Sequence, residues 1–163
     1  MAEALGRPFL DFDAEIERRE HTTIAQIFAE RGEAHFRALE RALTDDLKGS
    51  GGYILAPGGG WIANPGCLEA LRPPAELVYL EVEPARALER LAGDVAARPL
   101  LRRPDPLGEL ERLLAARKDL YLLANHTVRV DFLREKEVVA SIVADRKSTR
   151  LNSSHTDISR MPS

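Results

Sequence analysis

The chain has 163 residues, of which 44% are hydrophobic and 30% are charged, a balance that suits one domain with an apolar core. The net charge of -3 argues against nucleic acid and anionic membranes as partners, and no apolar stretch is long enough to span a bilayer. The only cysteine, Cys67, excludes an internal disulfide. Because a signal-peptide pattern is also lacking, a cytoplasmic protein is expected.

The first residues predict a helix end followed by a short strand. Gly6 is a typical C-terminal cap for the turn before it, and residues 8–13 read as a strand that ends in carboxylates. Asp11 and Asp13 stand two residues apart, so along an extended chain their side chains point to the same side. A plain alternative is that Asp13 caps a helix over residues 14–20.

Two helices are predicted next, over residues 23–31 and 33–47. Thr23 has capping-box spacing to a glutamine three residues later. In the second helix, Arg37 and Glu40 lie one turn apart beside the apolar stripe. Their simplest interpretation is an exposed helical ion pair, worth about 0.2–0.5 kcal/mol.

A strand that runs into glycines organises the rest of the chain. Residues 53–56 are apolar, Pro57 ends the strand, and Gly58, Gly59 and Gly60 follow. Glycines let the backbone approach a ligand closely, and such junctions at the carboxyl edge of an α/β sheet bind ligands. A plain flexible turn is the alternative, because a glycine triplet alone does not decide between them.

The second half is predicted to alternate in the same way. The predicted elements are helices over residues 64–71, 84–92, 107–123 and 135–143 and strands over residues 77–82 and 128–131. The strand over 77–82 is apolar almost throughout, as a buried parallel strand should be. Residues 93–106 form a loop rich in arginine and proline, which indicates a functional or a disordered segment. The alternation predicts an α/β fold, a parallel sheet with helices on both faces.

The composition changes near Arg146, where the chain becomes polar and rich in serine. We therefore expect a domain over residues 1–145 and a disordered tail over residues 146–163. The tail looks like translated vector or adaptor sequence, so a non-native origin is expected. A basic nucleic-acid arm is the alternative, but its basic residues are few and diluted by serine.

Five motifs in this order and spacing resemble the shikimate kinase family, from Met1 to about Val143. They are Phe-Leu-Asp-Phe-Asp at 9–13, Phe-Arg-Ala-Leu-Glu at 36–40, Pro-Gly-Gly-Gly at 57–60, Arg-Pro-Leu-Leu at 98–101 and Arg-Lys-Asp-Leu-Tyr at 117–121. The resemblance implies a three-layer, P-loop-kinase-like parallel sheet. It also implies transfer of the γ-phosphoryl group of ATP to the 3-hydroxyl of shikimate, in the synthesis of chorismate and the aromatic amino acids.

The resemblance also implies roles for residues on the shikimate side. Arg37 and Arg117 would pair with the carboxylate of shikimate, since guanidinium groups bind carboxylates bidentately. Asp13 and the glycines at 58–60 would bind its hydroxyls. Asp13 would hold the reacting hydroxyl and accept its proton.

On the phosphate side, the resemblance assigns two further residues. Asp11 would act on Mg²⁺ through water, because Mg²⁺ keeps much of its hydration shell. Arg98 would belong to a lid that closes over the ATP phosphates and stabilises their charge. The implied partners are shikimate and ATP, with Mg²⁺ as a cofactor, bound by a monomer.

One family motif is missing from the sequence. The family begins with a strand and a Gly-x-x-Gly-x-Gly-Lys-Ser/Thr loop that holds the ATP phosphates, and no such loop occurs here. The resemblance therefore predicts that the first, central strand is missing between the strands at Ile54 and Val78, and that this polypeptide has little or no kinase activity. Two alternatives stay open: a related small-metabolite kinase of the gluconate type, and a degenerate kinase that binds shikimate or a partner without catalysis.

Overall fold

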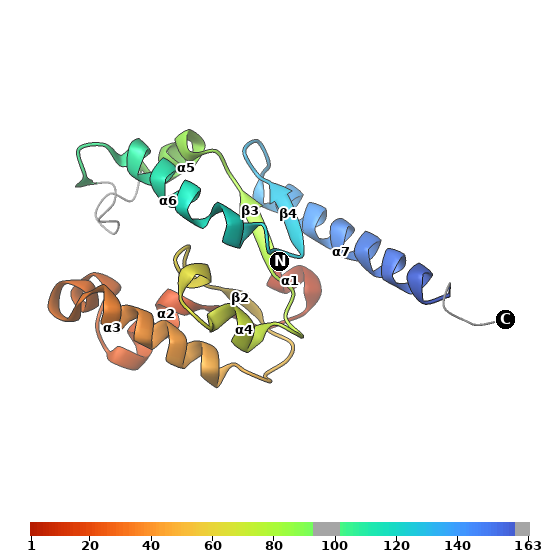
Figure 1. Ribbon diagram of the computed structural model, residues 1–163, viewed down its shortest axis with the longest axis horizontal. Coiled ribbons are helices and arrows are strands. Elements are labelled where there is room, and N and C mark those ends of the chain that lie inside the picture. Colours follow the sequence, from red (N-terminus) through yellow and green to blue (C-terminus); the bar gives the residue numbers. More distant parts are fainter. Residues whose placement is uncertain (93–101, 159–163) are drawn as a thin grey trace.

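The computed structural model describes residues 1–92 and 102–158, in which short strands alternate with helices (Figure 1). The elements are α1 (Ala2–Leu5), β1 (Phe9–Asp11), α2 (Phe12–Glu20), α3 (Ile24–Asp46), β2 (Ile54–Ala56), the 3-10 helix η1 (Trp61–Ala63), α4 (Cys67–Leu71), β3 (Val78–Glu81), α5 (Pro84–Leu91), α6 (Pro106–Tyr121), β4 (His126–Arg129) and α7 (Glu135–Ile158). This order confirms the predicted α/β class. Within the described ranges, no helix has both the length and the apolar content needed to cross a bilayer.

The strands form two separate parallel pairs. β1 pairs with β2, with Leu10 beside Leu55, and β3 pairs with β4, with Leu80 beside Val128. Across the described part of the chain, no strand joins β2 to β3. β2 and β3 therefore belong to separate strand pairs, and the missing strand that the resemblance implies stays a prediction.

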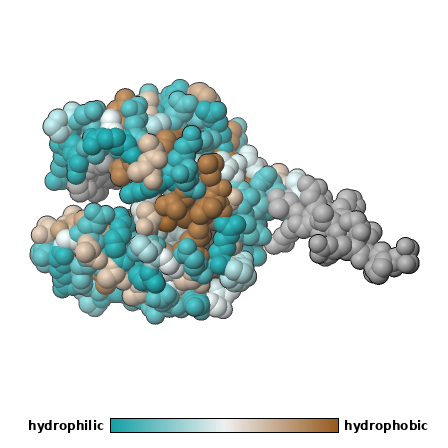
Figure 2. All heavy atoms as spheres, in the orientation of Figure 1, coloured by the Kyte–Doolittle hydropathy of each residue, from teal (hydrophilic) through white to brown (hydrophobic). Residues whose placement is uncertain are grey.

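Each strand pair belongs to one half of the molecule. Figure 1 shows β1 and β2 with α2, α3 and α4 in one half, and β3 and β4 with α5 and α6 in the other. The end of α6 links the halves, because Leu120 and Tyr121 pack against the core of the first half and α6 contacts η1. Figure 2 shows apolar side chains gathered where the two halves meet.

The larger apolar core lies in the first half. Its buried members are Phe12, Ile16, Ile27, Phe36, Leu43, Trp61, Ile62 and Cys67. Trp61, which the sequence predicts to be core, contacts the Phe12 ring edge-on at 6.3 Å between centroids. Since burying a large apolar side chain stabilises a fold by about 1.5–3 kcal/mol, this contact anchors the chain just after the glycines.

The boundary between β1 and α2 differs from the prediction. β1 ends at Asp11, and α2 begins at Phe12, so Asp13 lies in the first turn of a helix. Asp11 is the N-cap, and its Oδ1 accepts a hydrogen bond from the Ala14 amide at 3.0 Å. The predicted extended pair of carboxylates is therefore wrong, and so is a capping role for Asp13. We attribute the difference to Phe12, which is completely buried and is the first residue of α2, two residues before the predicted helix start.

The two helices predicted around Gly32 form the single element α3 with a kink. Gly32 has a φ of 80° and a ψ of 174°, which other residues rarely adopt. At the start of α3, the capping box between Thr23 and Gln26 is confirmed. The segment after the kink carries the residues of the candidate site.

The chain after the glycines also differs from the helix predicted over residues 64–71. Residues 61–63 form η1, and α4 begins only at Cys67, after Gly66 with a φ of 80°. Pro65 therefore lies in a turn and not in the first turn of a helix. This turn brings Asn64 back toward α3.

β3 is less buried than its apolar sequence predicts. Leu80 is 47% exposed, and Glu81 is exposed as well. The prediction of a fully buried parallel strand is therefore wrong: among the described residues β3 pairs with β4 alone, so no neighbouring strand shields its other edge.

Helix α7 ends at Ile158 and not near Val143, so the predicted helix end is wrong. Residues 135–158 contain neither glycine nor proline, the two residues that most often interrupt a helix. Contacts with the domain continue past residue 145, since Arg146 Nε donates to Glu76 Oε2 at 2.6 Å. The predicted non-native origin of residues 146–163 stays a prediction.

Candidate active site

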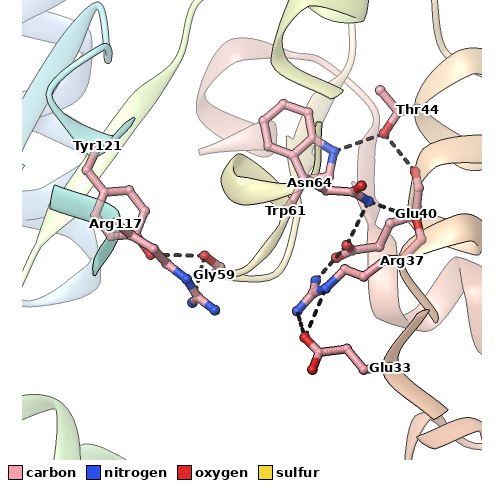
Figure 3. A network of polar contacts seen from close by, with 9 residues as sticks. All are labelled: Glu33, Arg37, Glu40, Thr44, Gly59, Trp61, Asn64, Arg117 and Tyr121. Carbon is pink, nitrogen blue, oxygen red and sulfur yellow. Dashed lines mark hydrogen bonds and ion pairs between the residues drawn. The ribbon is translucent and has the colours of Figure 1, made fainter. Parts of the chain in front are cut away.

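A hollow of about 290 Å³ opens between α3, α6 and the glycine loop, which we define as residues 57–60. Its lining residues are Glu33, Arg37, Gly60, Ala63, Asn64, Pro65 and Arg117. Figure 3 shows the guanidinium groups of Arg37 and Arg117 reaching the same open space from opposite sides. Three residues that the sequence assigns to substrate binding, Arg37, Gly60 and Arg117, are thus brought together.

A second hollow, of about 340 Å³, lies in the other half of the molecule and is lined by Arg129, Asp131, Phe132 and Leu133. Its arginine is already paired, because Arg129 Nε contacts Asp131 Oδ2 at 3.1 Å and its Nη2 contacts Glu83 Oε1 at 2.9 Å. The hollow between Arg37 and Arg117 is the better candidate for an anionic ligand, because two arginines line it and only one lines the second hollow.

Two carboxylates on α3 hold Arg37 in place. Its Nη1 donates to Glu40 Oε2 at 2.6 Å, and its Nη2 donates to Glu33 Oε1 at 3.2 Å. Burial acts to lower the Arg37 pKa, but the hydrogen bonds and charges of Glu40 and Glu33 outweigh it and raise the pKa overall. Arg37 therefore stays positively charged at the edge of the hollow.

Glu40 is fully buried, so the predicted exposed ion pair with Arg37 is wrong. Asn64 covers it: the Asn64 Nδ2 donates to the Arg37 carbonyl at 2.8 Å and contacts Glu40 Oε2 at 3.4 Å. The other oxygen, Oε1, is buried and has no hydrogen-bond partner among the described residues. Burial raises the pKa of Glu40, the Arg37 hydrogen bond opposes this, and the nearby Asp13 charge adds to the rise.

Glu40 should make stability depend on pH. A carboxyl with a raised folded pKa binds its proton more tightly in the folded chain, so its contribution to stability is present below the ordinary pKa and is lost as pH rises through the folded pKa. Glu40→Gln imitates the protonated form. We expect its free energy of unfolding, relative to the original chain, to be higher at about pH 8 than at about pH 5.

Urea unfolding of both chains at the two pH values measures this difference. Glu33→Gln is the matched control, because Glu33 pairs with the same arginine but is 67% exposed. Parallel pH curves for Glu40→Gln and the original chain would contradict the prediction.

Asp13 lies at the inner end of the glycine loop. A Cβ added to Gly58 would be 3.8 Å from Asp13 Oδ1 and 3.8 Å from Glu40 Oε1. Asp13 therefore lies beside Gly58, although neither residue lines the hollow and its position on α2 differs from the strand end that the sequence predicts. From there its carboxylate is placed to accept a hydrogen bond from a polar group bound against Gly58.

Gly60 makes room for the Arg37 guanidinium. A Cβ at Gly60 would lie 2.7 Å from the Arg37 Cζ, closer than real Cβ contacts. Its φ of -88° and ψ of -12° suit any residue. Space for the arginine, and not backbone conformation, is therefore what requires glycine at this position.

Gly59 connects the glycine loop to α6. Its carbonyl accepts hydrogen bonds from Arg117 Nη1 at 3.1 Å and from the Tyr121 hydroxyl at 2.9 Å (Figure 3). The Tyr121 ring stacks on Tyr79 of β3, with 4.7 Å between centroids and 7° between planes. The four-residue spacing of Arg117 and Tyr121 puts both side chains on one face of the helix, which is the signal by which sequence could have paired them.

Sequence reasoning also missed the hydrogen bonds that fix the chain after the glycines. Trp61 Nε1 donates to Thr44 Oγ1 at 2.9 Å, and that hydroxyl donates to the Glu40 carbonyl at 2.7 Å. Together with Asn64, these bonds hold η1 against α3. The only available signal was the position of Trp61 directly after the glycines.

The structure gives no shared site for the two residues predicted on the phosphate side, Asp11 and Arg98. Asp11 is exposed and caps α2, and Arg98 lies outside the described residues. Over residues 1–92 and 102–158, no three histidine, cysteine or acidic side chains gather into a group that could hold a metal ion.

Comparison with known proteins places this geometry in context. The profile of the family described as shikimate kinase matches residues 1–147. A shikimate kinase from Symbiobacterium thermophilum is 38% identical over 145 residues, which cover 88% of this chain and 83% of the relative. One from Mycobacterium avium is 40% identical over 151 residues, covering 91% and 84%. Shikimate kinase from Acinetobacter baumannii in complex with shikimate superimposes with a TM-score of 0.77 and 34% identity, over 94% of this chain and 83% of that chain.

Proposed function

This chain belongs to the shikimate kinase family, and on that premise we propose that its hollow binds shikimate for transfer of the ATP γ-phosphoryl group to the 3-hydroxyl. The observation that carries the proposal is the meeting of Arg37 and Arg117, from separate helices, at one hollow beside bare glycine backbone. Guanidinium groups bind carboxylates bidentately, so the pair suits the carboxylate of shikimate.

The hydroxyls of the ligand have acceptors and donors nearby. Asp13, beside Gly58, would hold the reacting hydroxyl and accept its proton, because a positioned carboxylate orients the nucleophile in phosphoryl transfer. The amides of the glycine loop would meet the other hydroxyls. Glu40 and Glu33 act indirectly, by fixing the Arg37 guanidinium.

For the phosphate side, ATP use follows from the family, and the proposal extends it to Mg²⁺. Since Mg²⁺ keeps several waters and takes few protein carboxylates, Asp11 acting through water is compatible with a single acidic residue. Arg98 would stabilise charge on the phosphates. A cytoplasmic monomer without nucleic-acid or membrane partners completes the proposal, and the pI near 5.9 supports the absence of polyanionic partners.

Calorimetric titration with shikimate and with gluconate tests the proposal. We expect one-to-one binding of shikimate and much weaker binding of gluconate, which is also a hydroxylated carboxylate. Equal affinities would favour a gluconate-type kinase, and no binding of either would contradict the proposal. An ATP-dependent phosphorylation assay on the same sample separately tests the prediction that this polypeptide shows little or no turnover.

Gly60→Ala should weaken shikimate binding by about 10-fold with little change in Tm. The added Cβ displaces the Arg37 guanidinium, and losing one charge-assisted hydrogen bond costs about 1.5 kcal/mol or more. The protein itself tolerates the change because a flexible side-chain end can move. Titration of the variant with shikimate measures the loss.

Gly51→Ala is the matched control, since Gly51 lies outside the glycine loop and its added Cβ would meet nothing within 4 Å. Equal affinity for shikimate in the Gly51 and Gly60 variants would show that the packing of Arg37 on Gly60 is unimportant.

A further inference from the structure

We propose that Tyr121 is a positioning residue, whose hydroxyl holds the Gly59 carbonyl while Arg117 leaves that carbonyl to bind a substrate carboxylate. This inference rests on the proposed function and adds to it a division of work between two donors on α6. Pairing between a carboxylate and two arginines does not by itself require this role for Tyr121. The role follows from the Gly59 carbonyl, which accepts hydrogen bonds from both Arg117 and Tyr121.

The Gly59 carbonyl accepts both hydrogen bonds at once. Arg117 Nη1 lies 3.1 Å from it and the Tyr121 hydroxyl 2.9 Å from it (Figure 3). A carbonyl oxygen has two lone pairs, so the two donors do not exclude each other. Removal of one donor leaves the other in place.

Arg117 is the donor that has a second task. It also lines the hollow, opposite Arg37, where a carboxylate would bind. A bidentate pair uses two of the five N–H groups of the guanidinium in a fixed fork, so turning that fork toward a ligand carboxylate would move the Nη1 that bonds Gly59. When Arg117 turns to the ligand, Gly59 depends on Tyr121 alone.

Tyr121 is built to stay in place. Its ring stacks on Tyr79 of β3, at 4.7 Å between centroids, and packs against the larger core. A tyrosine has two side-chain torsions, whereas arginine is long and flexible, so Tyr121 is the fixed donor and Arg117 the movable one. The fixed bond keeps the backbone on either side of Gly59 in position for the ligand hydroxyls.

Tyr121→Phe tests this, because it removes the hydroxyl and keeps the ring. Tyr79→Phe is the matched control, since it preserves the same ring stack but leaves the Gly59 donor intact. Two measurements are made on each chain: the carbonyl ¹³C resonance of Gly59 without ligand, and the dissociation constants of shikimate and cyclohexene-1-carboxylate, which lacks the hydroxyls.

We expect Tyr121→Phe to shift the Gly59 carbonyl resonance and to weaken shikimate binding by about 5- to 10-fold. Binding of cyclohexene-1-carboxylate should weaken less, because it does not use the glycine loop. Tyr79→Phe should leave the resonance and both dissociation constants close to those of the original chain. A role in packing alone would lower Tm without this difference between ligands.

An unchanged Gly59 carbonyl resonance in Tyr121→Phe would overturn the inference. If the original chain binds shikimate, an unchanged shikimate affinity in Tyr121→Phe would overturn it as well. Failure of the original chain to bind shikimate would overturn the proposed function and this inference with it. Titration of the original chain with shikimate therefore tells failure of the proposed function from failure of the Tyr121 inference.

Discussion

Replacing Arg37 with methionine is expected to weaken shikimate binding by at least about 100-fold. Methionine keeps an unbranched side chain but removes both donors that would face the carboxylate. Each charge-assisted hydrogen bond is worth about 1.5–3 kcal/mol, and every 1.4 kcal/mol is about a tenfold change in affinity. The substitution also leaves Glu40 buried without its cation. Calorimetric titration with shikimate measures the loss.

Arg31→Met is the control for this experiment. Arg31 lies on the same helix and also pairs with a carboxylate, Glu20 Oε2 at 3.0 Å, but it is not among the residues that line the hollow. Its affinity for shikimate should equal that of the original chain. Similar losses in both variants would mean that general charge, and not the Arg37 position, governs binding.

Asp13→Ala is expected to weaken shikimate binding by about 10- to 100-fold and to leave the binding of 3-deoxyshikimate almost unchanged. A carboxylate that accepts a hydrogen bond from the 3-hydroxyl contributes about 1.5–3 kcal/mol, and the deoxy ligand has no such group to lose. The difference between the two ligands isolates this one contact, as in a double-mutant cycle.

Equal weakening of both ligands by Asp13→Ala would contradict the assignment. Asp13 would then support the glycine loop and not the hydroxyl. Asp46→Ala serves as control for loss of a carboxylate, since Asp46 is exposed and paired with Arg19.

Features that depend only on neighbouring residues in the sequence, such as strand ends and helix caps, were predictable. Pro57 and the glycines after it mark a strand end by backbone chemistry alone, and β2 ends at Ala56. The capping box at Thr23 is equally local and is confirmed. The meeting of Arg37 and Arg117 was accessible only through the family resemblance, because no rule of spacing joins two distant helices.

Features that depend on tertiary contacts were not predictable. Glu40 has the spacing of a surface ion pair, yet η1 and Asn64 fold back over it. Asp11 and Asp13 are equivalent in the sequence, but burial of Phe12 makes one a helix cap and places the other beside Gly58. The bond from Tyr121 to Gly59 depends on how α6 lies against the glycine loop.

The most direct test of this account is a crystal structure of the chain with shikimate bound. We predict the carboxylate within hydrogen-bond distance of both the Arg37 and the Arg117 guanidinium groups, with ring hydroxyls toward Asp13 and the glycine loop. Shikimate bound elsewhere, such as in the hollow at Arg129 and Phe132, or bound with its carboxylate turned away from both arginines, would contradict it.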